Sequence, residues 1–307
     1  MTKIFIDGGA GTTGLVIHDR LKEYDGITVI TLPEELRKDE KARANAMNQA
    51  DVVFLCLPDS AAIEAVNLIT NENTVVIDTS TAHRTNDGWT YGFPELTGQK
   101  EKIKNSKRIA NPGCHASGFI SLVAPLTQMG VIKSDVNLTC FSITGYTGGG
   151  KKMIAEYEND MPTLYSAPRQ YGLSQKHKHV PEIMKVCNLK NQPAFCPIVS
   201  NFPRGMEVTV SINGKDVIGG IEKIKQAYKD YYKDGKIVYF NENADENGFL
   251  SANAFANKDS LEISVHGTDE NILLVARFDN LGKGASGAAI ENMNIVLGLP
   301  EEKGLTL

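Results

Sequence analysis

The stretch of sequence that decides the fold is KIFIDGGAGTTG, residues 3–14. A short apolar run is followed by three spaced glycines, Gly8, Gly11 and Gly14, and the residues up to Tyr24 are long enough for a helix. In such a turn Gly8 permits a tight bend, Gly11 lets a pyrophosphate approach the backbone, and the helix start supplies amide donors. An ordinary glycine-rich turn is the alternative, which the position between strand and helix disfavours. The stretch predicts a dinucleotide-binding unit.

Short apolar runs alternate with longer polar or amphipathic segments through the first third of the chain. Such runs are typical of strands that are buried on both faces of a parallel sheet. The predicted strands are 4–6, 27–30, 52–55 and 75–77, and the predicted crossover helices are 11–24, 39–49 and 60–67. This succession predicts an α/β fold with a Rossmann-like, doubly wound parallel sheet.

A different pattern begins after about residue 113, where longer β-rich segments appear. Residues 207–212 alternate between polar and apolar, as expected of a strand with one wet face. The predicted strands are 137–144, 206–212, 237–240, 261–266 and 272–278, with helices at 117–129 and 221–232. We therefore expect a second, α+β domain. A last helix, at 284–298, is expected to return to the first domain.

Composition narrows the class of protein. The 307 residues suit one large or two ordinary domains, and 41% hydrophobic content disfavours disorder. A net charge of −5 gives no electrostatic reason to expect nucleic acid or an anionic membrane as partner. No apolar run approaches the roughly 20 residues that span a bilayer. A small-molecule ligand is the expected partner, with no nucleic acid and no membrane.

The five cysteines are odd in number and widely scattered, without a CxxC pair. The chain starts with MTKIFI, which has no signal-peptide pattern. Both features predict a reducing cytoplasm.

The strongest local signal for chemistry is NPGCHAS, residues 111–117. Cys114 follows a Pro-Gly turn and precedes a predicted helix, where amide donors stabilise a thiolate. A buried structural thiol is the alternative, and it is our interpretation of Cys56. His177 and His179 form the only close pair of histidines and point the same way in an extended segment. Zinc would need further ligands at suitable spacing, so no metal is expected.

The end of the second predicted strand bears on the cofactor. Residues 31–33 are Thr-Leu-Pro, so no acid is placed there to bind the ribose hydroxyls of NAD. Such an acid would repel the 2′-phosphate of NADP, and its absence favours NADP. Arg37 and Lys38 could compensate the phosphate charge, or they could be solvated surface residues.

Several strings of residues, taken together, resemble the N-acetyl-γ-glutamyl-phosphate reductase family in its shorter bacterial form, a relative of aspartate-semialdehyde dehydrogenase. The resemblance runs nearly end to end. The strings are GGAGTTG (8–14), LPD (57–59), DTSTAHR (78–84), YGFPEL (91–96), NPGCHAS (111–117), HKHVPEI (177–183), PRG (203–205) and DNLGKGASGAA (279–289).

The resemblance implies an NADP-binding Rossmann domain at 1–113, completed by the C-terminal helix 284–307. It also implies a catalytic and dimerisation domain at 114–283 and a homo-oligomer, either dimer or tetramer.

The resemblance further implies that Cys114 is the nucleophile and that His177 is the acid/base residue, with Glu182 orienting it. His179 is the reserve candidate. Longer family members often carry a tyrosine where this chain has His115, which we rank below His177 because sequence neighbours on a helix do not face each other. The implied cofactor-binding residues are Gly8, Gly11, Thr12, Thr13, Gly14, Leu57, Pro58, Ser80 and Asn280. The implied substrate-binding residues are Arg84, Asn111, Glu182 and Arg204.

The implied activity is NADPH-dependent reduction of N-acetyl-γ-glutamyl phosphate to N-acetyl-L-glutamate 5-semialdehyde with release of phosphate, in arginine biosynthesis. Cys114 would form a thioester, Arg84 would bind phosphate, and Arg204 would bind phosphate or the α-carboxylate. One alternative is a reductase of another acyl phosphate, such as β-aspartyl phosphate. Another is a non-catalytic dinucleotide sensor, which would not need Cys114 or His177.

Overall fold

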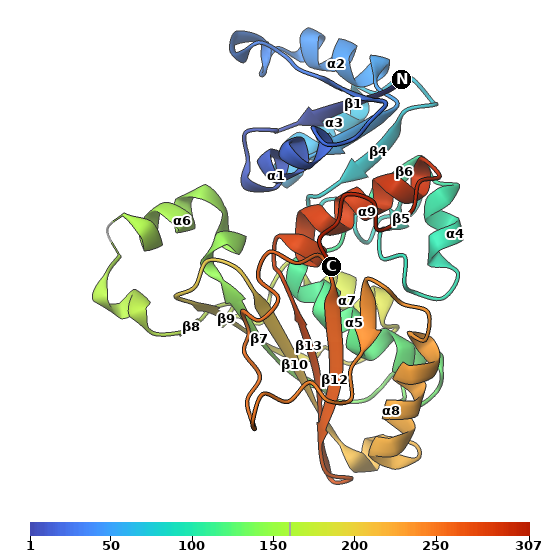
Figure 1. The fold of residues 1–307 in the computed structure, drawn as a ribbon, viewed down its shortest axis with the longest axis vertical. Coiled ribbons are helices and arrows are strands. Elements are labelled where there is room, and N and C mark those ends of the chain that lie inside the picture. The colour runs from blue at the N-terminus through green and yellow to red at the C-terminus, as the bar shows by residue number, and fades with distance from the viewer. Residues whose placement is uncertain (160) are drawn as a thin grey trace. The chain divides into compact units, whose positions relative to one another are not determined.

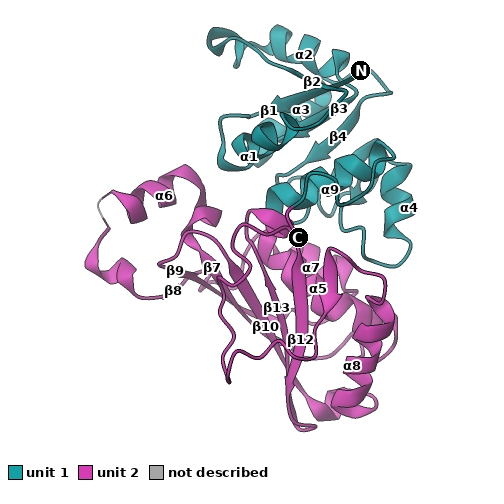
Figure 2. Ribbon diagram, viewed as in Figure 1, with its two compact units in different colours: residues 1–112, 285–305 teal, residues 113–284, 306–307 magenta. Residues whose placement is uncertain are grey.

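The computed structural model describes residues 1–159 and 161–307, which divide into two compact units (Figure 2). Unit 1 comprises residues 1–112 and 285–305, and unit 2 comprises residues 113–284 and 306–307. Among the described residues, no helix combines the length and the apolar character needed to cross a membrane.

Unit 1 is built on a parallel sheet (Figure 1). In spatial order its strands are β2 (Ile27–Ile30), β1 (Thr2–Asp7), β3 (Val52–Leu55), β4 (Val75–Asp78), β6 (Arg108–Ala110) and β5 (Thr90–Tyr91). Asp7 pairs with Leu55, and Leu55 with Asp78, so the carboxyl ends of three strands share one edge. In open α/β sheets this edge binds ligands.

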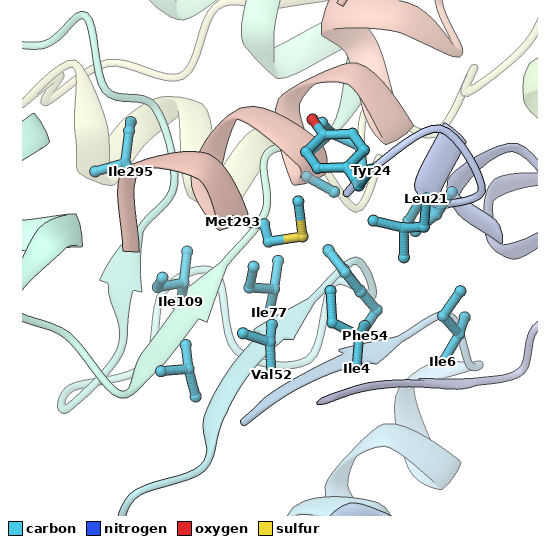
Figure 3. Packing of buried hydrophobic residues seen from close by; sticks show 14 of the residues in the cluster. Ile4, Ile6, Leu21, Tyr24, Val52, Phe54, Ile77, Ile109, Met293 and Ile295 are labelled. Carbon is cyan, nitrogen blue, oxygen red and sulfur yellow. The ribbon is translucent and has the colours of Figure 1, made fainter. Parts of the chain in front are cut away.

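Helices cover both faces of this sheet because its strands are apolar on both sides. On one face, Ile4 and Ile6 pack in a core with Met293 of α9 (Gly287–Val296), as Figure 3 shows. On the other face, Phe5 shares a core with Met47 of α2. The first face is covered by α1 (Thr12–Leu21), α4 (Gln99–Lys104) and α9, and the second by α2 (Glu40–Gln49) and α3 (Asp59–Asn67). The predicted doubly wound sheet is confirmed.

Unit 2 holds a mixed sheet. In spatial order its strands are β11 (Val238–Phe240), β12 (Leu261–Gly267), β13 (Asn271–Phe278), β10 (Met206–Asn213), β7 (Thr139–Gly145), β9 (Ala194–Ser200) and β8 (Arg169–Gln170). Two pairs, β7–β9 and β11–β12, are parallel and the others are antiparallel. The helices are α5 (Cys114–Gln128), α6 (Gly150–Glu158), α7 (Val180–Val186) and α8 (Gly220–Tyr231). The expected α+β architecture is confirmed.

Helix α5 lies unusually close to this sheet at Gly118. A Cβ atom on Gly118 would lie 2.5 Å from Cγ2 of Val208 and 2.8 Å from Cε1 of Phe278. No larger residue fits there without movement of the helix or the strands. The close contact fixes the start of α5, and therefore Cys114, relative to β10 and β13.

The structure contains five short elements that the sequence analysis does not predict, namely β5, β6, β8, α4 and α6. Three other differences have a physical reason. Helix α5 begins at Cys114, three residues before the predicted start at Ser117, because the extended residue Gly113 serves as its N-cap. The predicted last helix contains a π-helical turn, Gly282–Ser286, before α9. Strand β9 was not predicted, and it contains Pro197, a residue that weakens strand patterns.

Candidate active site

Cys114 is the first residue of α5 and is half-buried. The residue before it, Gly113, is extended (φ −81°, ψ 149°) and has no side chain to cap the helix. The thiol therefore sits at the positive end of the helix dipole, which stabilises a thiolate. A Cβ atom on Gly284 would lie 3.0 Å from Cβ of Cys114, so a larger residue at 284 would crowd the Cys114 side chain.

Glu182 supports the turn that carries Cys114. Its buried carboxylate accepts a hydrogen bond from the backbone N–H of Gly113, with Oε2 3.2 Å from the nitrogen. Glu182 lies in α7, which packs against α5. The contact connects the HKHVPEI segment to the residue immediately before Cys114.

His177, His179 and His115 form a cluster of rings in unit 2. The centroid of the His115 ring lies 5.5 Å from those of both His177 and His179, and the last two are 4.8 Å apart. The backbone N–H of His179 donates to Nδ1 of His177 at 3.2 Å. A neutral His177 ring therefore carries its proton on Nε2, which makes Nε2 the hydrogen-bond donor.

His115 is buried between two hydroxyl groups. Its Nδ1 lies 2.6 Å from Oγ of Ser142, and its Nε2 lies 2.6 Å from the hydroxyl of Tyr171. Burial, together with the charges of His177 and Lys178, lowers the pKa of His115 to about 3. The ring is neutral at physiological pH and both nitrogens are engaged, which disfavours it as the acid/base residue.

Tyr171 contacts His115 and is close enough to Cys114 for its pKa to respond to the charge of that thiol. Burial, and secondarily the charge of Cys114, raise the pKa of Tyr171, so its hydroxyl keeps its proton at neutral pH.

Within the part of the chain that the structure describes, no group of three His, Cys, Asp or Glu side chains is placed to hold a metal ion.

The PRG and DNLG segments meet in unit 2. Nε of Arg204 lies 2.8 Å from Oδ2 of the buried Asp279. Asn280 accepts a hydrogen bond from the N–H of Gly205 (3.0 Å) and donates one to Oγ1 of Thr147 (2.9 Å). These bonds fix the Asn280 amide and orient the Arg204 side chain, which is 23% exposed.

The glycine loop in unit 1 has the backbone geometry of a phosphate cradle. Gly8 has φ +82°, and a Cβ atom there would lie 2.3 Å from the carbonyl oxygen of Cys56. A Cβ atom on Gly14 would lie 2.8 Å from the carbonyl oxygen of Gly8. Gly11 is the N-cap of α1 and makes no side-chain cap bond, which suits the binding of a phosphate at the helix start.

The loop after β3 adjoins this cradle. The position of a Cβ atom on Gly8 would be 3.0 Å from Cδ2 of Leu57, and Pro58 is the N-cap of α3. Thr12 and Thr13 open α1. The residues present thus fit a dinucleotide at the carboxyl edge of the sheet.

Ser80 and Arg84 belong to a hydrogen-bonded segment after β4. Ser80 donates its N–H and its hydroxyl to the carboxylate of Asp78, at 2.9 and 2.7 Å. Oδ2 of Asp78 also lies 2.6 Å from Nδ1 of His83. The buried Arg84 donates from Nε to the carbonyl of Asn111 (2.9 Å) and from Nη2 to that of Thr79 (3.1 Å).

The Asn111 amide is also held within unit 1. Its Nδ2 donates to the carbonyl oxygen of Ala285 at 3.0 Å, and its Oδ1 accepts from Asn292 at 3.2 Å. Arg84 and Asn111 are therefore positioned by each other and by the segment that leads into α9.

Comparison with protein families decides the relationship of this chain to known proteins. The model described as "Semialdehyde dehydrogenase, NAD binding domain" matches residues 13–106, and "Semialdehyde dehydrogenase, dimerisation domain" matches residues 114–280. The chain belongs to the semialdehyde dehydrogenase family.

Curated members of this family are similar over nearly the whole chain. The N-acetyl-gamma-glutamyl-phosphate reductase 2 of Nostoc sp. is 43% identical over 318 residues, covering 99% of each protein. The N-acetyl-gamma-glutamyl-phosphate reductase of Brucella anthropi is 44% identical over 306 residues, covering 96% of this chain and 98% of the relative.

Solved structures of this semialdehyde dehydrogenase fold are more distant in sequence. Aspartate semialdehyde dehydrogenase II from Vibrio cholerae has a TM-score of 0.72 at 15% identity and covers 97% of this chain and 98% of its own. The Candida albicans aspartate semialdehyde dehydrogenase, solved with NADP, has a TM-score of 0.70 at 14% identity, with coverage of 97% and 98%. These similarities establish the shared fold.

Sequence reasoning does not identify several residues that position the candidate site. Ser142 and Tyr171 contact His115 from 27 and 56 residues away, and no spacing rule connects them. Asp78 contacts both Ser80 and His83, and the DTSTAHR string by itself gives no role to this acid. The sequence does contain a signal for Asp78: this acid directly follows a predicted apolar strand, which places it at the carboxyl edge of the sheet.

Proposed function

We propose that the protein reduces N-acetyl-γ-glutamyl phosphate to N-acetyl-L-glutamate 5-semialdehyde with NADPH, releasing phosphate, as a step of arginine biosynthesis in the cytoplasm. The identity of 43–44% to reductases of this name supports the substrate. The observation that carries the mechanism is the placement of Cys114 at the first position of α5, in the unit that also holds the histidine cluster. NADPH supplies the hydride when bound.

We assign cofactor binding to a domain of residues 1–113 completed by 284–307, and catalysis to residues 114–283. The cradle geometry of the glycine loop supports the first assignment. The proposed cofactor-binding residues are Gly8, Gly11, Thr12, Thr13, Gly14, Leu57, Pro58, Ser80 and Asn280.

In the first step the Cys114 thiolate attacks the γ-carbonyl carbon of the acyl phosphate. A C–S bond forms, the carbonyl oxygen becomes an oxyanion, and the bond from carbon to the phosphate oxygen then breaks. The backbone N–H of Cys114 and the side chain of Asn111 are the proposed donors to the oxyanion. Arg84 is proposed to bind the leaving phosphate, since a guanidinium pairs with two phosphate oxygens at once.

In the second step the thioester carbon accepts the hydride and its oxygen becomes an alkoxide. Nε2–H of His177 donates to this oxygen, because Nδ1 already accepts from His179. The C–S bond then breaks, which releases the aldehyde and restores the thiolate. Glu182 positions the turn before Cys114, and Arg204, oriented by Asp279, is proposed to bind the substrate α-carboxylate.

We further propose that two copies associate through the face of the unit 2 sheet that α5 does not cover. Phe141 lies opposite Thr209, and Leu273 lies opposite Ser211, so both apolar side chains are on one face. They are 46% and 40% exposed. The dimerisation-domain family model covers β7 and β13, the strands that contain Phe141 and Leu273. Sedimentation should show a dimer for the wild type and a monomer for Phe141→Glu, and a wild-type monomer would contradict the assignment.

The reverse reaction tests the proposed function. With NADP and phosphate, the enzyme should oxidise N-acetylglutamate 5-semialdehyde far faster than aspartate 4-semialdehyde, as seen in NADPH absorbance. A preference for aspartate semialdehyde would reassign the enzyme to β-aspartyl phosphate. Binding of NADP without oxidation of either aldehyde would indicate a dinucleotide sensor.

A further inference from the structure

We infer that Arg43, held in place by Asp7, recognises the 2′-phosphate of NADP and selects NADP over NAD. Arg43 belongs to none of the motifs that resemble the reductase family, and its contact with Asp7 becomes visible only in the folded chain. The inference rests on the proposed function, because it requires unit 1 to bind NADP.

Asp7 occupies the end of β1, between β2 and β3. The last residue of β2, Ile30, pairs with Phe5, so Asp7 lies two residues beyond the point where β2 ends. The glycine turn begins at the next residue, Gly8. In doubly wound folds that bind dinucleotides, the adenosine ribose is recognised beside the end of the second strand. The Asp7 carboxylate is therefore at the edge of the sheet where that recognition takes place.

Arg43 reaches the same edge from the first turn of α2, the helix that follows β2. Its Nη2 lies 2.8 Å from Oδ2 of Asp7, and its Nε lies 3.2 and 3.3 Å from the two carboxylate oxygens. The side chains are 15% and 5% exposed. Bidentate pairing between a guanidinium and a carboxylate fixes the plane of the guanidinium group. Within the described residues, Asp7 is the only hydrogen-bond partner of that group.

The pair changes what Asp7 can bind. An acid near the end of the second strand binds the ribose hydroxyls of NAD and repels a 2′-phosphate. Here the Asp7 oxygens accept from Arg43, which neutralises their charge and occupies them. The Nε and Nη2 edge of the guanidinium faces Asp7, so the edge that contains Nη1 remains for phosphate oxygens.

Arg43 also has an advantage over the two basic residues that the sequence suggests. Arg37 and Lys38 are exposed, in the segment after the 3-10 turn Glu34–Leu36. Ordering a mobile side chain on binding costs about 0.5–1.5 kcal/mol, and a side chain already fixed by an ion pair avoids most of that cost. The anchored Arg43 is therefore the stronger candidate for phosphate selection.

The alternative is that the pair only ties α2 to β1. Binding of two probes to the full chain separates the roles, with adenosine 2′,5′-bisphosphate carrying the 2′-phosphate and adenosine 5′-monophosphate lacking it. By calorimetry, Arg43→Met should weaken binding of the bisphosphate by about 10- to 100-fold and leave the monophosphate unchanged, as expected for loss of a charge-assisted pair. The double variant Asp7→Asn with Arg43→Met leaves no unpaired buried carboxylate and should show the same loss.

Arg37→Met and Lys38→Met are the matched controls and should keep the wild-type preference for the bisphosphate. Equal weakening of both probes in the Arg43 variants, or loss of the preference only in the Arg37 or Lys38 variants, overturns the inference and leaves the proposed function intact. If the wild type itself shows no preference for the bisphosphate, both the inference and the NADP assignment fail.

Discussion

The neutral state of the buried His115 should make the protein less stable in mild acid. The pKa of this ring falls from 6.5 for an ordinary histidine to about 3 in the folded chain. The unfolded chain therefore binds the proton more tightly, and protonation favours unfolding as the pH falls below 6.5 toward 3. Above that window the contribution is constant. Between about pH 7 and about pH 5, proton linkage at this one group lowers the free energy of unfolding by about 2 kcal/mol.

The test compares the wild type with His115→Gln, whose amide keeps one donor and one acceptor for Ser142 and Tyr171. Urea unfolding followed by circular dichroism gives the free energy of unfolding of both proteins at the two pH values. Titrating groups distant from residue 115 are common to the two proteins and cancel in the double difference. The wild type should lose about 2 kcal/mol more than the variant on acidification.

An equal loss in the two proteins would refute this reasoning. It would mean that His115 is charged in the folded chain, and the hydrogen-bonded chain from Ser142 through His115 to Tyr171 would then be assigned wrongly. It would also restore His115 as a candidate for the acid/base role.

Three further changes test other parts of the site. Cys114→Ser should keep NADP binding but lose turnover by several orders of magnitude, because a serine hydroxyl is a far weaker nucleophile than a thiolate at neutral pH; iodoacetamide labelling of another cysteine first, with an active Cys114→Ser enzyme, would contradict the assignment. His177→Asn should depress kcat and kcat/KM together and remove one limb of the pH profile, and His179→Asn should be milder; the reverse order would move the role to His179. Gly8→Ala should weaken NADP binding and lower the melting temperature, because its φ of +82° and the neighbouring carbonyl leave no room for a methyl group; an unchanged dissociation constant for NADP would argue against the phosphate cradle.

The sequence alone predicts the doubly wound sheet of unit 1 and four of its six strands, β1 to β4, but not β5, β6 or α4. The predicted segments 27–30 and 52–55 coincide with β2 and β3, and β3 is a continuous apolar run because both of its faces are covered. The sequence of β9 is harder to recognise as a strand, because Pro197 lies within it. Its partner β7 is more than 50 positions away in the chain, so no local pattern indicates their pairing. Short-range patterns predict short-range structure, and pairing between distant segments needs the folded chain.

The candidate site likewise combines residues that local sequence patterns identify with residues that only the folded chain brings together. Cys114 is evident from the sequence because a turn and a helix start adjoin it. The partners of His115 and the contact between Asp7 and Arg43, 36 residues apart, are not, because each arises where separate elements pack together. Motifs in this sequence therefore identify the proposed reactive group better than the side chains that position it.

Trapping the acyl-enzyme tests the central claim most directly. Enzyme mixed with N-acetyl-γ-glutamyl phosphate in the absence of NADPH should release one phosphate per active site and gain the mass of one N-acetylglutamyl group. Peptide mass spectrometry after an acid quench should find that group on Cys114, and added NADPH should discharge it as the aldehyde. Phosphate release with no adduct on Cys114, or an adduct on another residue, would contradict the account.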